Sequence, residues 1–224
     1  MVNTGDRGKG GATIDSLRNL EIQEKYRTAA PRYDVAMRPL EYVVLRRWRR
    51  FLLGRATGRV LEVACGTGVN LPYYPPGTSL VLVDLSPEML SIARTRATDL
   101  GMAAAAFVMD AARLEFPSAS FDTLVSSLGT CTFPDPIATL KEMSRVCRPG
   151  GQILLLEHGR STSPLLAAIQ DRFAAPWASR TGCRWNHDVL GLISQAGMKP
   201  VLVKTSLWGI VCCVVAVPGS TARP

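Results

Sequence analysis

From Arg59 onward, short β-rich runs alternate with helical runs, and this alternation is the sequence feature that most restricts the fold. Strands are predicted at residues 59–63, 79–84, 105–109, 122–126, 152–157, 199–205 and 207–217, and helices at residues 87–100, 136–147, 165–175 and 188–196. Apolar strands that alternate with helices form a parallel sheet with helices on both faces. Because the last two strands follow each other almost directly, they must form an antiparallel hairpin at one edge. The sequence therefore predicts a doubly wound α/β fold with a mostly parallel sheet.

The segment before the first strand has a different character. Its first 13 residues are polar and rich in glycine, which is typical of a loosely ordered tail. Two helices are predicted next, at residues 14–29 and 35–53, separated by Pro31. We therefore expect a tail and helical lid over residues 1–55 and a core over residues 56–224, within one domain overall.

The net charge of +8 is concentrated in this first quarter of the chain. Residues 1–60 hold 13 Lys and Arg against 6 Asp and Glu, and the remainder is almost balanced. A patch of Arg46, Arg47, Arg49 and Arg50 predicts weak peripheral contact with an anionic membrane. The alternative interpretation is a solvated helix that covers the core. Aromatic residues make up only 7% of the chain, so we do not expect a nucleic-acid partner.

The cysteines and the first residues of the chain indicate the cellular compartment in which we expect the protein. Six cysteines without a CxxC pair predict free thiols, and two histidines without HxxxH spacing predict no metal site. The first residues lack the apolar core of a secretory signal, and the longest apolar run is too short to cross a bilayer. The sequence thus predicts a cytoplasmic protein, with peripheral membrane contact through the basic helix. It does not indicate an oligomeric state.

A glycine-containing loop follows the first predicted strand. In a doubly wound sheet, ligands bind beyond the carboxyl ends of the strands, beside the loop after the first strand. Gly66 and Gly68 leave the backbone bare there, but Leu71 occupies the third position of a dinucleotide-binding GxGxxG motif. The upstream Glu62 would repel a pyrophosphate and suits a cation. The loop therefore disfavours a nicotinamide-dependent reductase, which remains a remote alternative.

The next two strand ends carry carboxylates. Asp84 can accept hydrogen bonds from both hydroxyls of a ribose, and Asp110 with the backbone of Ala111 can bind the edge of an adenine. A ribose, an adenine and a cationic group together describe S-adenosylmethionine. The sequence thus predicts this cofactor, with S-adenosylhomocysteine as the product.

Several motifs occur in a characteristic order: LEVACGTG at residues 61–68, Asp84, Asp110, Phe121-Asp122, and LKEMSRVCRPGG at residues 140–151. In these motifs the chain resembles the class I S-adenosylmethionine-dependent methyltransferases of the type 11 group, over residues 25–217. This resemblance implies a seven-stranded sheet whose last strand is antiparallel. It also implies the cofactor-binding residues: Tyr33, Glu62, Ala64, Gly66, Gly68, Asn70, Asp84, Leu85, Met89, Asp110, Ala111, Ser127 and Leu128.

The resemblance assigns parts of the cofactor to some of these residues. Glu62 is expected to face its amino acid end, Gly66 and Gly68 to lie beneath it, and Asp84 to bind the ribose. Asp110 and Ala111 would hold the adenine. The same family places Ser127 and Leu128 beside the methyl group.

The methyl acceptor is predicted from further resemblances. The runs CGTGVN at residues 65–70, YPPG at 74–77, Glu157-His158, APW at 175–177 and Gly182-Cys183 resemble the animal alkyl thiol methyltransferases. This implies S-methylation of a small or lipophilic thiol. Phospholipid amine N-methyltransferases and quinone C-methyltransferases share the cofactor motifs, so both remain alternatives, as does a non-catalytic binding module.

His158 is the candidate catalytic residue, because it ends the fifth predicted strand and faces the expected pocket. It would take a proton or position the acceptor; the alternative is a structural histidine. His187 is interpreted as an exposed polar residue and Cys131 as a bystander thiol. Aromatic residues that would line an acceptor site, or pack in the core instead, are Phe173, Trp177 and Trp185, and those expected to flank the lid are Tyr26 and Tyr33.

Overall fold

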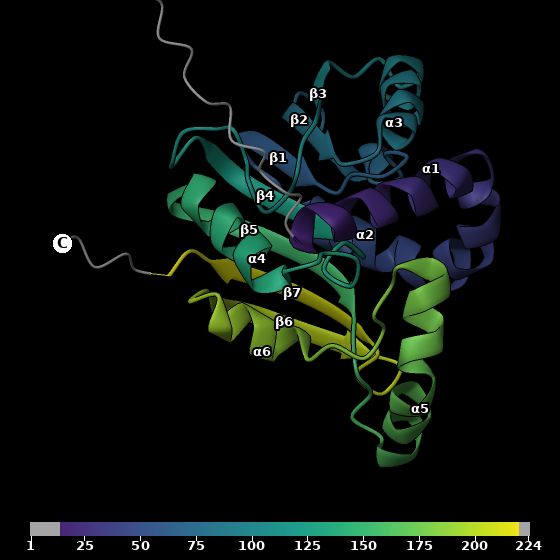
Figure 1. The fold of residues 1–224 in the computed structure, drawn as a ribbon. Helices are drawn as coiled ribbons and strands as arrows, with labels where there is room; N and C mark the ends of the chain where they lie inside the picture. Colours follow the sequence, from purple (N-terminus) through teal and green to yellow (C-terminus); the bar gives the residue numbers. More distant parts are fainter. Residues whose placement is uncertain (1–13, 220–224) are drawn as a thin grey trace, which may run out of the picture.

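A seven-stranded sheet forms the centre of the protein in the computed structural model, which describes residues 14–219 (Figure 1). The strand order is β3-β2-β1-β4-β5-β7-β6. The strands are β1 (Arg59–Val63), β2 (Ser79–Asp84), β3 (Ala104–Val108), β4 (Phe121–Ser127), β5 (Cys147–His158), β6 (Lys199–Ser206) and β7 (Val211–Val217). The first five are parallel and β7 is antiparallel to both neighbours. The predicted fold class, including the antiparallel last strand, is confirmed. The predicted N-terminal tail, residues 1–13, lies outside the described residues.

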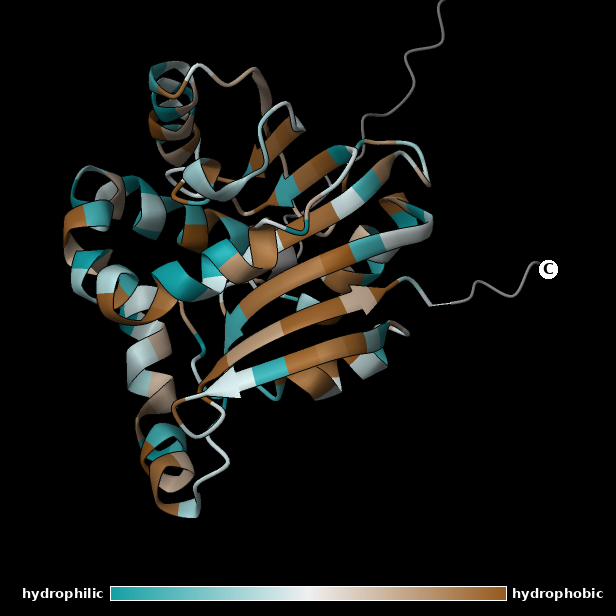
Figure 2. Cartoon of the chain, turned by 180° about the vertical axis from the view of Figure 1, so that it is seen from behind, coloured by the Kyte–Doolittle hydropathy of each residue, from teal (hydrophilic) through white to brown (hydrophobic). Residues whose placement is uncertain are grey.

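Helices cover both faces of the sheet. They are α1 (Ile14–Leu40), α2 (Arg46–Leu53), α3 (Pro87–Asp99), α4 (Pro136–Val146), α5 (Pro164–Thr181) and α6 (Val189–Gln195), with a π-helix η1 (Glu41–Leu45) and a 3₁₀-helix η2 (Leu71–Tyr73). Helices α2 and α3 pack with one apolar cluster, and α4 and α6 with the other. Adjacent strand residues alternate between these clusters, as Val60 and Leu61 do, because successive side chains of a strand point to opposite faces. Figure 2 shows hydrophobic residues concentrated in the middle of the sheet.

Side-chain caps fix where three of the helices begin. Ser86 accepts a hydrogen bond from the backbone of Met89, and Asp135 accepts one from Ala138 in the same way. Asp188 likewise caps α6. These caps satisfy backbone N–H groups that have no partner within the helix. The loops before α3 and α4, which lie at the carboxyl ends of β2 and β4, are thereby held in place.

The predicted break at Pro31 is wrong. Helix α1 continues through Pro31 to Leu40, and the chain then passes through η1 into α2 without leaving helical geometry. A proline within a helix removes one backbone hydrogen bond, that to the carbonyl four residues earlier. Here that residue is Arg27, which is exposed, so water can bind the free carbonyl. The lost backbone hydrogen bond therefore costs little free energy on this side of the helix.

Three other boundaries differ from prediction, and the first is that strand β5 begins at Cys147, five residues before its predicted start. Helix α5 extends to Thr181, through Pro176 and beyond the predicted end at residue 175. The hairpin between β6 and β7 has a turn over residues 207–210, where β7 had been expected to begin. Leu207 and Trp208 have positive φ angles there, which end the strand geometry.

No helix within residues 14–219 is both long and apolar enough to span a bilayer.

Candidate active site

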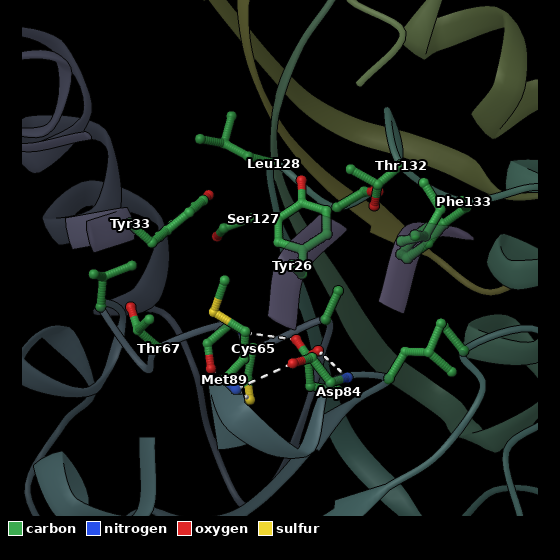
Figure 3. Close-up of a pocket in the computed structure, with 18 of the residues that line it drawn as sticks. Tyr26, Tyr33, Cys65, Thr67, Asp84, Met89, Ser127, Leu128, Thr132 and Phe133 are labelled. Carbon is green, nitrogen blue, oxygen red and sulfur yellow. Dashed lines mark hydrogen bonds between the residues drawn. The ribbon is translucent and has the colours of Figure 1, made fainter. Parts of the chain in front are cut away.

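A cavity of about 310 Å³ opens at the carboxyl ends of β1 to β4, beneath α1. Ten of the thirteen predicted cofactor residues line it: Tyr33, Ala64, Gly66, Asp84, Leu85, Met89, Asp110, Ala111, Ser127 and Leu128. Figure 3 shows Asp84 on one side of the cavity and Leu128, Thr132 and Phe133 on the other. We call the strand-end residues Ala64, Gly66, Asp84, Asp110 and Ser127 the floor. The opposite wall, made by α1 with Leu128, Thr132 and Phe133, is called the outer side.

The two glycines of the loop after β1 have different roles. Gly66 has a φ of +56°, and a side chain added there would meet no atom within 4 Å, so its backbone is open to the cavity. Gly68 has a φ of +74°, and an added Cβ would lie 2.9 Å from Leu71 and 3.1 Å from Ala93. Gly68 therefore allows the loop to pack against α3. It does not line the cavity, which differs from its expected position beneath the cofactor.

Asp84 is held by the backbone. Its Oδ2 accepts a hydrogen bond from the N–H of Gly66 (2.7 Å) and its Oδ1 accepts one from Ser86 (2.9 Å). Burial raises the pKa of Asp84, and these backbone bonds oppose that shift. The carboxylate keeps free lone pairs on both oxygens, so it can still accept hydrogen bonds from a ligand.

Asp110 joins the floor to the lid. Its Oδ1 accepts a hydrogen bond from the backbone of Ala112 (2.9 Å), and its Oδ2 accepts one from Asn19 Nδ2 on α1 (2.7 Å). Gln23, one turn further along α1, donates to the carbonyl of Leu85 (3.1 Å). These contacts hold α1 across the strand ends. The roles of Asn19 and Gln23 were not predicted, because no local pattern in the sequence distinguishes them from other polar helix residues.

Glu62 lies behind the cavity and not on its surface. Its side chain is buried, accepting hydrogen bonds from Asn70 Nδ2 (2.8 Å) and from the hydroxyl of Tyr74 (2.7 Å). Burial raises the pKa of Glu62 to about 7, although both hydrogen bonds act in the opposite direction. Asn70 also donates to Ser127 Oγ (3.0 Å). Neither Glu62 nor Asn70 lines the cavity, so both support the floor from behind.

The prediction that Arg49 belongs to an exposed basic patch is wrong. It is only 3% exposed, donates to both carboxylate oxygens of Glu41 (2.9 Å) and to Asn70 Oδ1, and lines the cavity. Arg46, Arg47 and Arg50 are exposed, as expected. The burial of Arg49 has a signal in the sequence.

That signal is helical spacing. Leu45, Arg49, Leu52 and Leu53 follow the i, i+4, i+7, i+8 pattern of one helix face, and all four are buried. An arginine on such a face needs an acidic partner, which Glu41 provides eight residues earlier.

Two tyrosines of α1 line the cavity. The rings of Tyr26 and Tyr33 are 6.1 Å apart. Burial raises the pKa of Tyr33 to about 12 and raises that of Tyr26 well above its usual value, so both hydroxyls are neutral at physiological pH. Asp34, which follows Tyr33 in the sequence, accepts a hydrogen bond from Thr67 Oγ1 (2.6 Å) and forms an ion pair with Arg96. The predicted lid position of both tyrosines thus matches the geometry.

His158 does not line the cavity but lies in a neighbouring cluster. Its Nε2 is 3.3 Å from Cys183 Sγ, and both atoms lie within 4.8 Å of Cys131 Sγ. Burial by itself lowers the pKa of His158, but Cys183 and Glu157 outweigh it and raise that pKa. In the same cluster the pKa of Cys131 is raised and that of Cys183 is lowered, chiefly because the two thiols share a hydrogen bond.

The cluster adjoins the outer side of the cavity. Cys131 Sγ lies 3.4 Å from the carbonyl oxygen of Leu128, which lines the cavity. Cys131 and Cys183 both raise the pKa of Tyr26, so they lie within electrostatic range of it. Cys131 was predicted to be a bystander thiol that could lie near the site, and it lies beside the candidate catalytic histidine; its predicted bystander role stays a prediction.

The predicted aromatic wall lies apart from the cavity. Trp177 and Trp185 stack on each other with centroids 4.9 Å apart, and Phe173 is 53% exposed. None of the three lines the cavity. His187, expected to be exposed, is half-buried, and its Nε2 is buried without a hydrogen-bond partner among the described residues.

Comparison with known proteins identifies the domain. A sequence model of the methyltransferase domain family matches residues 61–155. The chain is 30% identical over 211 residues to the mitochondrial methyltransferase OMS1 of Saccharomyces cerevisiae, covering 85% of this chain and 45% of that protein. It is 38% identical over 119 residues to phosphatidylethanolamine N-methyltransferase of Cereibacter sphaeroides (52% and 59% covered). It is also 38% identical over 155 residues to demethylmenaquinone methyltransferase of Deinococcus radiodurans (66% and 64%). The chain thus spans about half to two thirds of the length of these relatives.

Solved structures agree with this assignment. Geranyl diphosphate C-methyltransferase of Streptomyces coelicolor, solved with S-adenosyl-L-homocysteine, has a TM-score of 0.70, 14% identity, and coverage of 93% of this chain and 100% of that chain. At this identity the likeness shows the fold. The predicted resemblance to alkyl thiol methyltransferases stays a prediction. Residues 61–155 belong to the methyltransferase domain family, and the chain has the class I, S-adenosylmethionine-dependent methyltransferase fold.

Proposed function

We propose that the protein transfers a methyl group from S-adenosylmethionine to a small lipophilic nucleophile, with a thiol as the first candidate. The observation that carries this proposal is the continuity of the cavity. Its floor offers the carboxylates Asp84 and Asp110, while its outer side is lined by apolar groups that include Met37, Leu128 and Phe133. A cofactor on the floor and an apolar acceptor on the outer side would therefore share one enclosed space.

The polar groups of the cavity suit the cofactor. Asp84 and Asp110 have free lone pairs for the ribose hydroxyls and the adenine amine. Arg49 is a buried cation on the cavity surface, so it is suited to the carboxylate of the cofactor's amino acid end. Glu41, its partner, lines the same region and can attract the ammonium group. Glu62 would act through Asn70, which contacts both Glu62 and Arg49.

The reaction requires mainly alignment. Methyl transfer from a sulfonium is an in-line displacement, so the protein must orient the nucleophile and exclude water. Helix α1 covers the cavity and is tied to the floor through Asn19 and Gln23, which supports water exclusion. A thiol becomes a strong nucleophile on losing its proton near its ordinary pKa of about 8.5, so it needs less activation than a carbon acceptor.

The relatives favour a second candidate acceptor. Their names specify a phospholipid amine and a demethylated quinone, both of which are lipids. Exposed apolar residues Tyr42 and Val43 lie close in sequence to the exposed Arg46, Arg47 and Arg50. This combination fits the interface of an anionic membrane, where such substrates are found.

Two measurements test the proposed function. Calorimetric titration should show binding of S-adenosylmethionine and of S-adenosylhomocysteine to the full chain; absence of both would refute the proposal. A screen with methyl-labelled cofactor should then compare alkyl thiols, phosphatidylethanolamine vesicles and demethylated quinones. Transfer to thiols alone supports the first candidate, and transfer to either lipid supports the second. Cofactor binding without transfer to any of them would favour a non-catalytic module.

A further inference from the structure

Three side chains from distant segments meet beside the outer side of the cavity. Cys131 comes from the loop after β4, His158 ends β5, and Cys183 lies between α5 and α6. Their ligand atoms all lie within 4.8 Å of one another, and Cys183 Sγ is 3.3 Å from His158 Nε2. The proposed methyl transfer does not require this cluster.

We propose that Cys131, His158 and Cys183 are ligands of a zinc-class transition metal ion. Zinc binds cysteine sulfur at about 2.3 Å and histidine nitrogen at about 2.0–2.1 Å, usually in tetrahedral geometry. Those bond lengths separate neighbouring ligand atoms by about 3.5–3.8 Å. The three atoms are therefore already near metal-binding spacing, and small side-chain movements would complete it.

Charge at the cluster supports a cation there. The carboxylate of Glu157 is completely buried in the residue next to His158, and it has no Lys or Arg partner among the ion pairs of residues 14–219. It accepts hydrogen bonds from Ser126 and from the backbone of Gly129 and Thr130. Two metal-bound thiolates and a neutral imidazole would balance a divalent cation. Burial raises the pKa of Glu157, and a bound cation nearby would favour its ionised form.

A further nitrogen donor lies in the segment between α5 and α6, which also carries Cys183. The Nε2 of His187 is buried and has no hydrogen-bond partner within the described part of the chain. The backbone carbonyl of His187 accepts a hydrogen bond from the N–H of Arg160, two residues after His158 (2.9 Å). An unpaired buried nitrogen is costly, and metal coordination would satisfy it. His187 is not among the residues whose ligand atoms lie within 4.8 Å of one another, so we propose it as the fourth ligand after a side-chain movement that brings its ring nitrogen to the metal.

The site would tie the segment between α5 and α6 to the sheet. Gly182, next to Cys183, approaches the lid: a Cβ added there would lie 2.7 Å from Ile22 of α1. A metal bound through Cys183 would thus fix the position of this segment against α1. Such a bond network would stabilise the outer side without contributing a residue to the floor.

Metal analysis of the full chain tests the proposal. The protein is purified without chelators under reducing conditions, and its zinc content is measured by elemental mass spectrometry. The bound zinc is then replaced by cobalt(II). The visible and near-ultraviolet absorption of cobalt(II) reports tetrahedral coordination and thiolate ligands. We expect one zinc ion per chain and cobalt spectra with thiolate charge-transfer bands.

Variants connect the metal to these residues. Cys183→Ala and Cys131→Ala should each lower metal retention at least ~10-fold, and His187→Ala should alter the cobalt ligand-field bands. The matched control is Cys147→Ala, a buried cysteine at the opposite end of β5. Cys183 is only half-buried, so its variant is expected to fold, which circular dichroism verifies.

Three outcomes would overturn the assignment. The first is wild-type protein that retains no zinc and gives no cobalt bands. The second is metal retention that the two cluster variants leave unchanged. The third is a Cys131–Cys183 disulfide in the reduced preparation, detected by counting free thiols after denaturation, because it would remove two of the ligands. Unchanged cobalt bands in His187→Ala would exclude His187 from the site.

Discussion

The floor and the outer side of the cavity are built in different ways. Floor residues stand at the ends of consecutive strands, and backbone bonds such as that from Gly66 to Asp84 hold them. The outer side is assembled from α1, the loop after β4 and their neighbours, and side-chain contacts such as that of Asn19 with Asp110 hold it. The proposed cofactor site is thus encoded locally, whereas the proposed acceptor site depends on long-range packing. Five substitutions or conditions test this difference, from the largest expected effect to the smallest.

Arg49 connects the two regions, so replacing it should have the largest effect. Arg49→Gln would leave Glu41 without its cation and weaken the contact with Asn70. Removing one partner of a buried ion pair costs about 3–5 kcal/mol in the free energy of unfolding. Urea denaturation measures this loss. Arg50→Gln, an exposed neighbour, is the control and should change stability by less than ~0.5 kcal/mol; equal effects of the two variants would contradict the buried role of Arg49.

The buried Glu62 should make stability depend on pH. Its pKa is about 7 in the folded protein and 4.5 in the unfolded chain, so the folded state holds the proton more tightly. Its contribution is therefore fully present below pH ~4.5 and is lost as the pH rises through about 7, a change of about 3 kcal/mol. Urea denaturation of the cofactor-free protein at several pH values measures it.

Glu62→Gln should flatten this pH dependence, because glutamine does not titrate. The exposed Glu115→Gln is the matched control and should leave it unchanged. A Glu62→Gln variant with the same pH profile as the wild type would show that Glu62 does not titrate between pH 4.5 and 7.

Substitutions of the two loop glycines should separate an effect on stability from an effect on cofactor binding. Gly68→Ala should lower the free energy of unfolding by about 2 kcal/mol, because both its positive φ and the contacts with Leu71 and Ala93 oppose a side chain. The methyl group added in Gly66→Ala meets no atom within 4 Å. The free energy of unfolding should therefore fall only by the strain of the positive φ, about 1 kcal/mol. The added methyl group would instead weaken cofactor binding. Thermal denaturation measures the stability of both variants, and cofactor titration measures their affinity. A larger loss of stability in Gly66→Ala than in Gly68→Ala would contradict the packing role assigned to Gly68.

Asp84 tests the floor directly. Asp84→Asn keeps the size of the side chain but removes the charge that would accept hydrogen bonds from the ribose. A bond to a charged acceptor is worth about 1.5–3 kcal/mol, so the affinity for S-adenosylmethionine should fall about 30-fold. Calorimetric titration measures it, with the exposed Asp99→Asn as the control. An unchanged affinity would remove Asp84 from the proposed ribose contact.

The smallest effect is expected at the exposed arginines. Replacing Arg46, Arg47 and Arg50 together with Gln should reduce binding to anionic vesicles by a few fold, and added salt should reduce wild-type binding similarly. Vesicle sedimentation measures both. Cofactor affinity should not change, because these residues do not line the cavity. Equal sedimentation of wild type and variant would contradict the predicted membrane contact.

Much of the floor was predictable because its signals are short in sequence. Strand ends are visible in the apolar pattern, and Asp84 and Asp110 stand directly at or after them. The assignment of Glu62 was less accurate: its sequence position was read correctly as a strand residue, but its side chain points to Asn70 and Tyr74 and not into the cavity. Which way a buried carboxylate turns depends on partners that a local motif does not specify.

The sequence by itself determined the sheet, its antiparallel edge and the row of carboxylates at the strand ends, because these follow from periodicity and from residues a few positions apart. Only the tertiary structure decided that Glu62 turns away from the cavity, that α1 closes over the floor, and that Cys131 and Cys183 meet at His158. Those contacts join residues far apart in the chain, such as Cys183 and His158 at a separation of 25 residues. Their formation depends on how whole helices and strands pack, and no spacing in the sequence records it.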